Sequence, residues 1–199
     1  MVEAVRCDMN EFNSFTWQMA MAQSHQQLDS WNNRSNRVVL TALRLYERAL
    51  WRGRLARLAA WLGRRPYHPL DLAMAAEQCQ ITNRYHAGLQ TVPLAQIQGS
   101  DGRSHDFDAA FRPCQKHSRE SWLRVAQARL AGEALPPVEL IQVGGVYFVR
   151  DGHHRISVAR SMGQKTIDAE VTVWQAANAL TWEQAKQEKP TRTVKAPAA

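Results

Sequence analysis

A five-residue segment late in the chain combines a turn with three side chains that could bind an anion. The segment follows a strand-like run, Val146–Arg150, and overlaps the start of a helical pattern, His153–Met162. The first turn of a helix has unpaired N–H groups and about half a unit of positive charge, which disfavours basic side chains there. A bound phosphate or carboxylate would remove this conflict and bring the donors together. The predicted phosphate-binding turn consists of Asp151, Gly152, His153, His154 and Arg155.

The same segment has a second interpretation that needs no ligand. Asp151 would cap the helix and pair with Arg155, and both histidines would stay neutral. The two interpretations differ in their pH dependence. A bound phosphate favours the protonated form of His153 and His154, so ligand affinity would rise as the pH falls through the histidine range. Short motifs carry a real false-positive rate, and the residues alone leave both interpretations open.

Acidic side chains gather in a polar loop, Gly99–Asp108, and suggest a catalytic alternative. Carboxylates beside a phosphate site could hold Mg²⁺ together with substrate phosphates, or one of them could act as a general base. We favour the other interpretation, an exposed loop of turn-forming and helix-capping residues. The candidate catalytic residues are Asp101, Asp106 and Asp108, with His105 beside them and His153 in the turn.

The segment Arg34–Arg65 is strongly basic. Its nine arginines and single acid, Glu47, give a net charge of +8, which exceeds the formal +7 of the whole chain. This concentration suggests a polyanionic partner, nucleic acid first, because binding of phosphates releases counterions; a solvated helix face is the equal alternative. Trp51 and Trp61 stand among these arginines and could stack on bases, but we favour packing against other helices. The predicted nucleic-acid contacts are Arg44, Arg48, Arg52 and Arg57.

The elements that must position these residues fall into two parts. Residues 1–81 form a helical, Arg-rich region, and the apolar periodicity predicts helices over Phe15–Leu28, Asn36–Leu62 and Leu70–Cys79. Residues 82–186 form a mixed domain, and residues 187–199 read as a disordered tail. In the mixed domain, strands are predicted over Val92–Ile97, Val138–Val143, Val146–Arg150 and Ile167–Trp174, and helices over Arg119–Leu130, His153–Met162 and Ala176–Lys186. Gly144-Gly145 is a two-residue hairpin signal.

The composition excludes several classes of protein. The chain has 199 residues, 45% of them hydrophobic and 22% charged, which is typical of a globular protein. No apolar run approaches the ~18 residues of a membrane span, and we expect no membrane partner. The three cysteines are too scattered for a disulfide framework or a zinc pair, so no metal site is predicted. Because the first residues resemble neither a secretory signal nor a transit peptide, we expect a cytoplasmic protein.

The second half of the chain resembles the ParB/sulfiredoxin superfamily, in its ParB-like domain form. The resemblance extends over residues 90–174, somewhat under half of the chain. The segments that carry it are Leu94–Ile97, Gly102–Arg103, Phe107–Asp108, Leu135–Leu140, Val146–Arg150, and Asp151–Arg155 with Ala159 and Gly163. It implies an α+β fold, a small mixed sheet with helices, here preceded by an all-helical N-terminal extension.

The resemblance also implies a ligand for the turn. Gly152, His154 and Arg155 correspond to positions that hold nucleotide phosphates in relatives, so CTP, ATP or ADP with Mg²⁺ is the expected cofactor. His153 stands where sulfiredoxins have their reactive Cys and ParB proteins a Glu, which argues against sulfiredoxin chemistry and against CTP hydrolysis. The leading prediction is therefore a protein, associated with DNA, that binds a nucleotide or nucleic-acid phosphate.

Several alternatives stay open beside this prediction. One is a small-molecule phosphotransferase of the free-serine-kinase type, with Asp101, Asp106 or Asp108 as base or metal ligand. Another is a nuclease of the same superfamily, and a third is an interaction module that has lost the ligand. Neither enzymatic activity nor homo-oligomerisation is decided by these residues.

Overall fold

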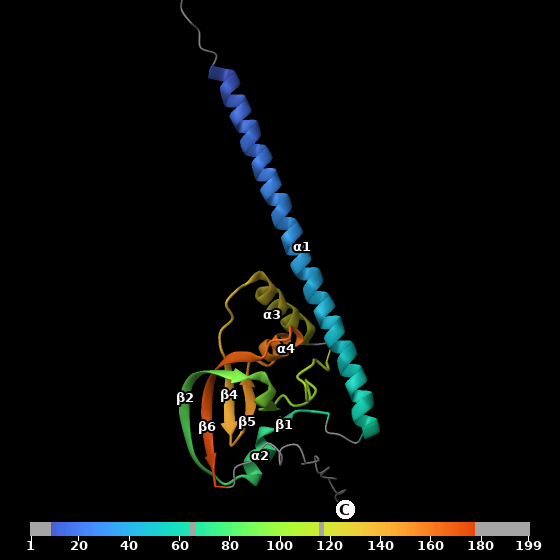
Figure 1. The fold of residues 1–199 in the computed structure, drawn as a ribbon, viewed down its shortest axis with the longest axis vertical. Coiled ribbons are helices and arrows are strands. Elements are labelled where there is room, and N and C mark those ends of the chain that lie inside the picture. Colours follow the sequence, from blue (N-terminus) through green and yellow to red (C-terminus); the bar gives the residue numbers. More distant parts are fainter. Residues whose placement is uncertain (1–8, 64–66, 116–117, 178–199) are drawn as a thin grey trace, which may run out of the picture. The chain divides into compact units, whose positions relative to one another are not determined.

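A computed structural model describes residues 9–63, 67–115 and 118–177 of the chain. The chain divides into two compact units, residues 1–41 and 42–199. The first unit is one helix in its described part, and this helix, α1 (Met9–Gly63), continues into the second unit (Figure 1). We predicted two helices here and drew the domain boundary at residue 82. α1 is continuous because neither Gly nor Pro interrupts residues 9–52.

The second unit is built on a six-stranded mixed sheet, which confirms the α+β class. Its strands are β1 (Leu70–Asp71), β2 (Ile81–Pro93), β3 (Ile97–Ser100), β4 (Val138–Val143), β5 (Val146–Asp151) and β6 (Thr166–Ala176). The strand order is β1-β3-β5-β4-β6-β2. β4 pairs antiparallel with β5, and β6 with β2, whereas the β1–β3, β3–β5 and β4–β6 pairs are parallel.

Both faces of the sheet are covered. On one face, α4 (His153–Ser161) contributes Ile156 and Ala159 to a core that includes Phe107 and Phe111. On the other face, α2 (Leu72–Gln78) contributes Leu72 and Ala75. α2 begins at Asp71, whose carboxylate accepts a hydrogen bond from the Ala73 N–H at 2.9 Å and so caps the helix. A short 3-10 helix, η1 (Leu94–Gln96), joins β2 to β3.

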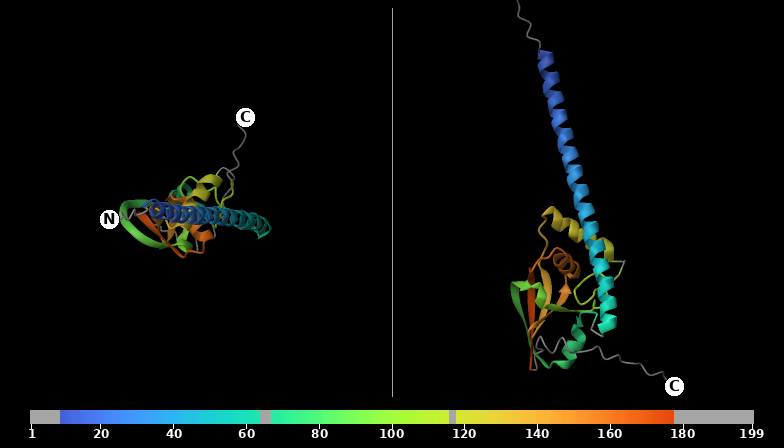
Figure 2. Two further views of the ribbon diagram at one scale, coloured as in Figure 1. Left: turned by 90° about the horizontal axis from the view of Figure 1, so that it is seen from above. Right: turned by 45° about the vertical axis from the view of Figure 1, so that its right-hand side comes forward.

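A third cluster joins the second half of α1 to α3 (Arg119–Ala131) and α4. The side of α1 that packs here carries a small residue, Ala42, and a flat one, Tyr46. They pack against Trp122 and Ala126 of α3 and Val158 of α4. α3 and α4 lie next to each other, as Figure 2 shows. Ala42, Leu45, Tyr46 and Leu50 belong to this cluster, and α1 from Ala42 onwards belongs to the compact unit. None of the described helices contains a stretch apolar enough to cross a membrane.

The mixed domain largely follows the predicted order of elements. The helix beginning at Arg119, the hairpin at Gly144-Gly145 and the helix beginning at His153 are confirmed. The predicted helix over Leu70–Cys79 begins later, because its first two residues form β1. The predicted last helix is wrong at Ala176, which ends β6, and its remaining residues, like the predicted tail, lie outside the described residues.

The largest difference is β2, which begins at Ile81, well before the predicted strand at Val92. β2 is an edge strand that pairs only with β6, and most of its side chains are exposed. It therefore lacks the alternation of apolar and polar residues by which a half-buried strand is recognised. Its register comes from the backbone pairing with β6, from Ile81–Ala176 to Pro93–Thr166.

Candidate functional site

The Asp151–Arg155 turn joins the end of β5 to the start of α4. Gly152 is the residue before the helix, and its φ of 91° lies in the left-handed region that favours glycine. A Cβ atom on Gly152 would lie 2.5 Å from Cγ1 and 2.9 Å from Cβ of Val138, in the neighbouring strand β4. Both the backbone conformation and the packing of Val138 therefore require glycine here, without any contribution from a ligand.

His153 points into the core and not toward solvent. Its side chain is only 3% exposed, and its Nε2 lies 2.8 Å from the Ser100 hydroxyl oxygen. The imidazole stacks on Phe107, with 5.7 Å between ring centroids and 19° between ring planes. Burial lowers the pKa of His153 to about 4, and the positive charge of Arg103 acts in the same direction. His153 is therefore neutral near pH 7, as the ligand-free interpretation of the turn requires.

Arg155 is bound to groups of the protein itself. Its Nη2 donates to Oδ2 of Asp151, and its Nη1 donates to the carbonyl oxygens of Pro136 and Pro137, each at 2.7 Å. This is the Asp151–Arg155 pair that the ligand-free interpretation predicts. The second part of that interpretation, in which Asp151 caps the helix, is wrong, because α4 has no side-chain hydrogen bond at its N-cap. The Asp151 carboxylate is 66% exposed, so the ion pair itself adds little stability. Arg155 ties α4 to the segment that precedes β4.

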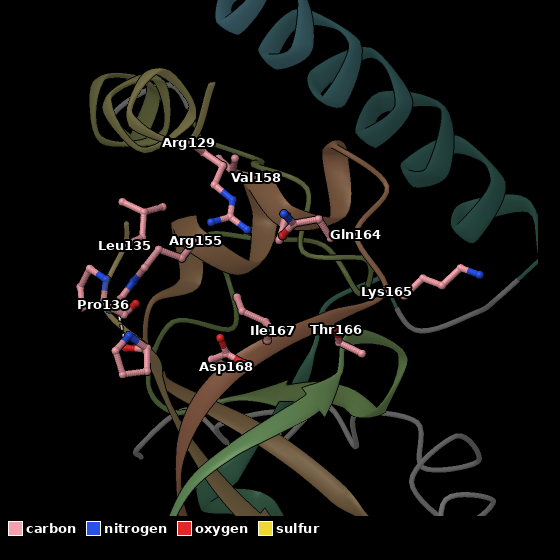
Figure 3. Close-up of a pocket in the computed structure, with 12 residues that line it drawn as sticks. Arg129, Leu135, Pro136, Arg155, Val158, Gln164, Lys165, Thr166, Ile167 and Asp168 are labelled. Carbon is pink, nitrogen blue, oxygen red and sulfur yellow. Dashed lines mark hydrogen bonds between the residues drawn. The ribbon is translucent and has the colours of Figure 1, made fainter. Parts of the chain in front are cut away.

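Arg155 also lines a cavity of about 380 Å³ between α3, α4 and the start of β6 (Figure 3). Arg129, Arg155 and Lys165 are its cationic side chains, and Asp168 is the one carboxylate among its lining residues. Arg129 and Arg155 lie on the same side of this cavity, whereas Lys165 extends away from them (Figure 3). Asp168 already accepts a hydrogen bond from the Thr91 hydroxyl at 2.8 Å. The lining of the cavity thus contains three cationic side chains and one carboxylate, next to the predicted turn.

The loop carboxylates are engaged in separate interactions. Asp108 is buried, and its oxygens accept hydrogen bonds from Nε of Arg112 at 2.7 Å and from the N–H groups of Arg112 and Ala110 at 2.8 and 3.0 Å. These bonds hold a tight turn in which Phe111 has a φ of 57°. Asp106 pairs with Arg103 at 3.1 Å. Asp106 and Asp108 therefore pair with different arginines.

The structure gives no metal ligand set for these residues. In residues 9–63, 67–115 and 118–177, no three His, Cys, Asp or Glu side chains lie close enough to hold a metal ion. The His105 ring packs edge-on against His68, with 5.3 Å between ring centroids, and Asp101 is half-buried. His105, Asp106 and Asp108 are thus held by contacts within the protein.

The basic part of α1 presents arginines and tryptophans to solvent. Arg44, Arg48, Arg52 and Arg57, the predicted nucleic-acid contacts, are all exposed. Trp51 is 63% and Trp61 78% exposed, so the preferred prediction that they pack against other helices is wrong. The reason is that small residues, together with Tyr46, form the packed side of α1 and leave no space there for an indole ring. Trp122, in contrast, is fully buried and donates from Nε1 to the Ser157 hydroxyl at 2.8 Å.

Sequence reasoning missed the residues that complete the core around the turn. Ser100, at the end of β3, and Phe107 hold His153 from two sides, yet both lie about fifty residues before it in sequence. Arg160 was missed as well; its Nη2 donates to the carbonyl oxygens of Leu94 and Ile97 at 2.6 Å. No spacing rule links such distant residues. The signal that was available concerned Phe107 alone, which belongs to the segment Phe107–Asp108 of the family resemblance.

Comparison with known proteins finds similarity to solved structures. No family model and no curated protein matches the chain. Among solved structures, a sulfiredoxin from Arabidopsis thaliana is similar to part of it, with 20% sequence identity and a TM-score of 0.30. The matched region covers 44% of this chain and 86% of the sulfiredoxin. The α+β class follows from the sheet and its helices, and membership of the ParB-like family stays a prediction.

Proposed function

We propose that the protein binds nucleic acid through the exposed side of α1 between Ala42 and Gly63. The observation that carries this proposal is the exposure of two indole rings, those of Trp51 and Trp61, among exposed arginines. Glu47 is the one acidic residue in this stretch of helix. We call this surface the Arg/Trp face; it consists of Arg44, Arg48, Trp51, Arg52, Arg54, Arg57 and Trp61.

Arginine and tryptophan serve different parts of a nucleic acid. Guanidinium groups neutralise phosphates and release counterions, whatever the base sequence. Indole rings stack on bases, which only an unpaired strand presents. A surface that offers both, on a helix held against α3 and α4 by Ala42 and Tyr46, suits a single strand better than a duplex. We therefore propose single-stranded DNA or RNA, bound with little sequence preference.

Three leucines, Leu55, Leu58 and Leu62, are also exposed on this part of α1. They lie at helical spacing with Trp51 and would suit a protein partner with an apolar surface. Such a partner would bind without a strong dependence on salt, because little charge would be neutralised. The salt dependence of binding therefore separates the two partners.

The test measures the binding of a fluorescent single-stranded oligonucleotide by anisotropy over a range of salt concentrations. Reversing Arg44 and Arg57 to Glu should weaken binding by about tenfold or more and reduce the slope against salt by about two. The matched control reverses Arg124 and Arg150, which are equally exposed but lie on α3 and β5. Equal losses in the two double variants would contradict the Arg/Trp face as the binding surface.

The cavity shown in Figure 3 supports a second candidate function, the binding of a nucleotide. Arg129 and Arg155 lie on one side of a space of about 380 Å³, and its one lining carboxylate, Asp168, accepts a hydrogen bond from Thr91. CTP, ATP or ADP, with Mg²⁺, would place phosphates near Arg155 once Arg155 releases the exposed carboxylate of Asp151. A thermal-shift series of these nucleotides with and without Mg²⁺ tests it, since binding to the folded state raises its stability.

The structure offers no support for extending this candidate to a kinase or a nuclease. Asp108 is committed to Arg112 and to the turn at Phe111, and Asp106 is paired with Arg103. A phosphotransferase would show Mg²⁺-dependent turnover that falls in one of Asp101→Asn, Asp106→Asn or Asp108→Asn while nucleotide binding persists.

A further inference from the structure

Arginines from three separate segments converge on a second cavity, which is separate from the Asp151–Arg155 turn. The cavity measures about 260 Å³ and lies between α1, the turn after Asp108, and the C-terminal end of α4. We call it the arginine cavity. Its lining residues are Leu45, Arg48, Ala49, Arg52, Ala110, Arg112, Arg160 and Ser161. Every charged residue in this lining is an arginine.

Arg160 carries a largely desolvated charge into this cavity. Its Nη2 donates to two carbonyl oxygens, those of Leu94 and Ile97, and its guanidinium carbon lies 4.9 Å from the centroid of the Phe111 ring. Burial lowers the pKa of Arg160 to about 10, so the group is still charged at neutral pH. Within the described part of the chain, no carboxylate forms an ion pair with Arg160, and its Nε and Nη1 have no hydrogen-bond acceptor.

The other three arginines leave the cavity strongly positive. Arg112 donates to Asp108 and, through Nη1, to the carbonyl oxygen of Arg52 at 3.0 Å. Arg48 and Arg52 lie one helical turn apart, and both are exposed. Among the described residues, Asp108 is the one carboxylate that pairs with any of the four. Four guanidinium groups and one carboxylate thus leave an excess of three positive charges.

The end of α4 opposes an anion, but only weakly. A helix C-terminus carries about half a unit of negative charge. The last carbonyl groups of α4 are already bonded, since those of Val158, Ala159 and Arg160 accept from the N–H groups of Met162, Gln164 and Gly163. The arginine excess is several times larger than this opposing partial charge, and the net field in the cavity favours an anion.

We propose that the arginine cavity binds a phosphate dianion, supplied either as a small phosphorylated molecule or as the terminal phosphate of a nucleic-acid strand. The planar fork of a guanidinium matches two phosphate oxygens, and the tetrahedral phosphate can present oxygens to several such forks at once. A dianion would also add counter-charge to Arg160, which the Asp108 carboxylate attracts without forming an ion pair with it. This inference does not depend on nucleic-acid binding by the Arg/Trp face, although Arg48 and Arg52 belong to both surfaces.

The test compares two double variants with the same change of charge on the same helix. Arg48→Gln/Arg52→Gln removes two exposed arginines that line the cavity, whereas Arg44→Gln/Arg57→Gln removes two that do not. The affinity of the full chain for inorganic phosphate is measured by calorimetry at constant ionic strength, with chloride as the reference anion. Loss of two charge-assisted contacts should weaken phosphate binding by about tenfold or more in the first variant and by less than about twofold in the second. Equal affinities in the two variants, or a wild-type protein that does not prefer phosphate to chloride, would overturn the proposal.

A second measurement distinguishes the two sources of the phosphate. A short oligonucleotide with a 5′-phosphate is compared with the same oligonucleotide ending in a 5′-hydroxyl. A preference for the phosphorylated strand that disappears in Arg48→Gln/Arg52→Gln assigns the cavity to strand ends. No such preference, together with binding of inorganic phosphate, assigns it to small phosphorylated molecules. Failure of the Arg/Trp face would be seen separately, as 5′-hydroxyl strand binding that Arg44→Gln/Arg57→Gln leaves unchanged.

Discussion

The Asp151–Arg155 turn and the Arg/Trp face of α1 are both rich in basic residues, but their side chains are in opposite situations. In the turn, His153 is bonded to Ser100, and Arg155 is bonded to Asp151 and to two carbonyl oxygens. On α1, Arg44 and Arg57 extend into solvent, and Trp51 is 63% exposed. The contrast shows that basic side chains of similar type can be held by partners within the protein in one region and exposed in another.

Substitution of Gly152 should have the largest effect, and it tests whether packing holds the Asp151–Arg155 turn. Replacement by Ala would force a left-handed φ on a residue with a side chain and would place its Cβ 2.5 Å from Val138 Cγ1. Strain and overpacking together should lower the free energy of unfolding by about 3–5 kcal/mol, measured by urea denaturation. Gly145→Ala is the matched control, because no heavy atom lies within 4 Å of a Cβ there. A Gly152→Ala protein of wild-type stability would mean that the turn is not held by packing.

The pH dependence of stability tests the burial of His153. Its pKa is about 4 in the folded protein, against an ordinary value near 6.5 when the chain is unfolded. The unfolded state therefore binds the proton more tightly, so this contribution to stability is complete above pH 6.5 and is lost as the pH falls toward 4. The loss should reach roughly 3 kcal/mol, from the shift in pKa.

Two variants isolate this effect from the titration of carboxylates. His153→Gln should be less stable than wild type at pH 7, but its stability should change less between pH 6.5 and 4. His86→Gln, at an exposed position of β2, should keep the wild-type pH profile. Urea unfolding at a series of pH values gives both results. Identical pH profiles for wild type and His153→Gln would show that burial does not lower the pKa of His153.

If bases stack on Trp51, the loss of this side chain should weaken the binding of a single strand more than that of a duplex. Trp51→Ala should weaken binding of a single-stranded oligonucleotide by about 1–3 kcal/mol, the usual value of one base stacked on an aromatic side chain. Binding of the corresponding duplex should change little, because its bases are not accessible. Thermal unfolding serves as the control, since an exposed side chain contributes little to stability. Equal losses for single strand and duplex would exclude base stacking.

The smallest effect is expected for the ion pair in the turn. Asp151→Asn removes a partner of Arg155 whose carboxylate is 66% exposed. Exposed pairs contribute about 0–1 kcal/mol, and Arg155 keeps its bonds to Pro136 and Pro137. Urea unfolding should therefore give a stability close to that of the wild type. A loss of several kcal/mol would show that the pair organises the whole turn.

The sequence predicted the elements whose pattern is local and missed those fixed by distant contacts. The strand–turn–helix around Gly152 was predicted because turn residues and apolar periodicity lie within a few residues of each other. β2 was missed because most of its residues are exposed, and its strand conformation depends on pairing with β6, some eighty residues away.

The candidate site shows the same limit. The types of residue in the turn could be read from the sequence. The hydrogen bond between His153 and Ser100 could not, because it joins residues 53 positions apart. The exposure of Trp51 and Trp61 depends on which side of α1 packs against α3 and α4, and both sides of the helix carry apolar residues. Periodicity alone does not choose between two apolar sides.

Photo-crosslinking tests the central claim most directly. A single-stranded oligonucleotide containing a photoreactive base is bound to the full chain, irradiated, and the linked peptides are identified by mass spectrometry. We expect the crosslinks in the peptides that contain Trp51 and Trp61, and we expect high salt to abolish them. Crosslinks concentrated between Asp151 and Asp168, around the turn and the cavity beside it, would contradict the account and make that turn the nucleic-acid site.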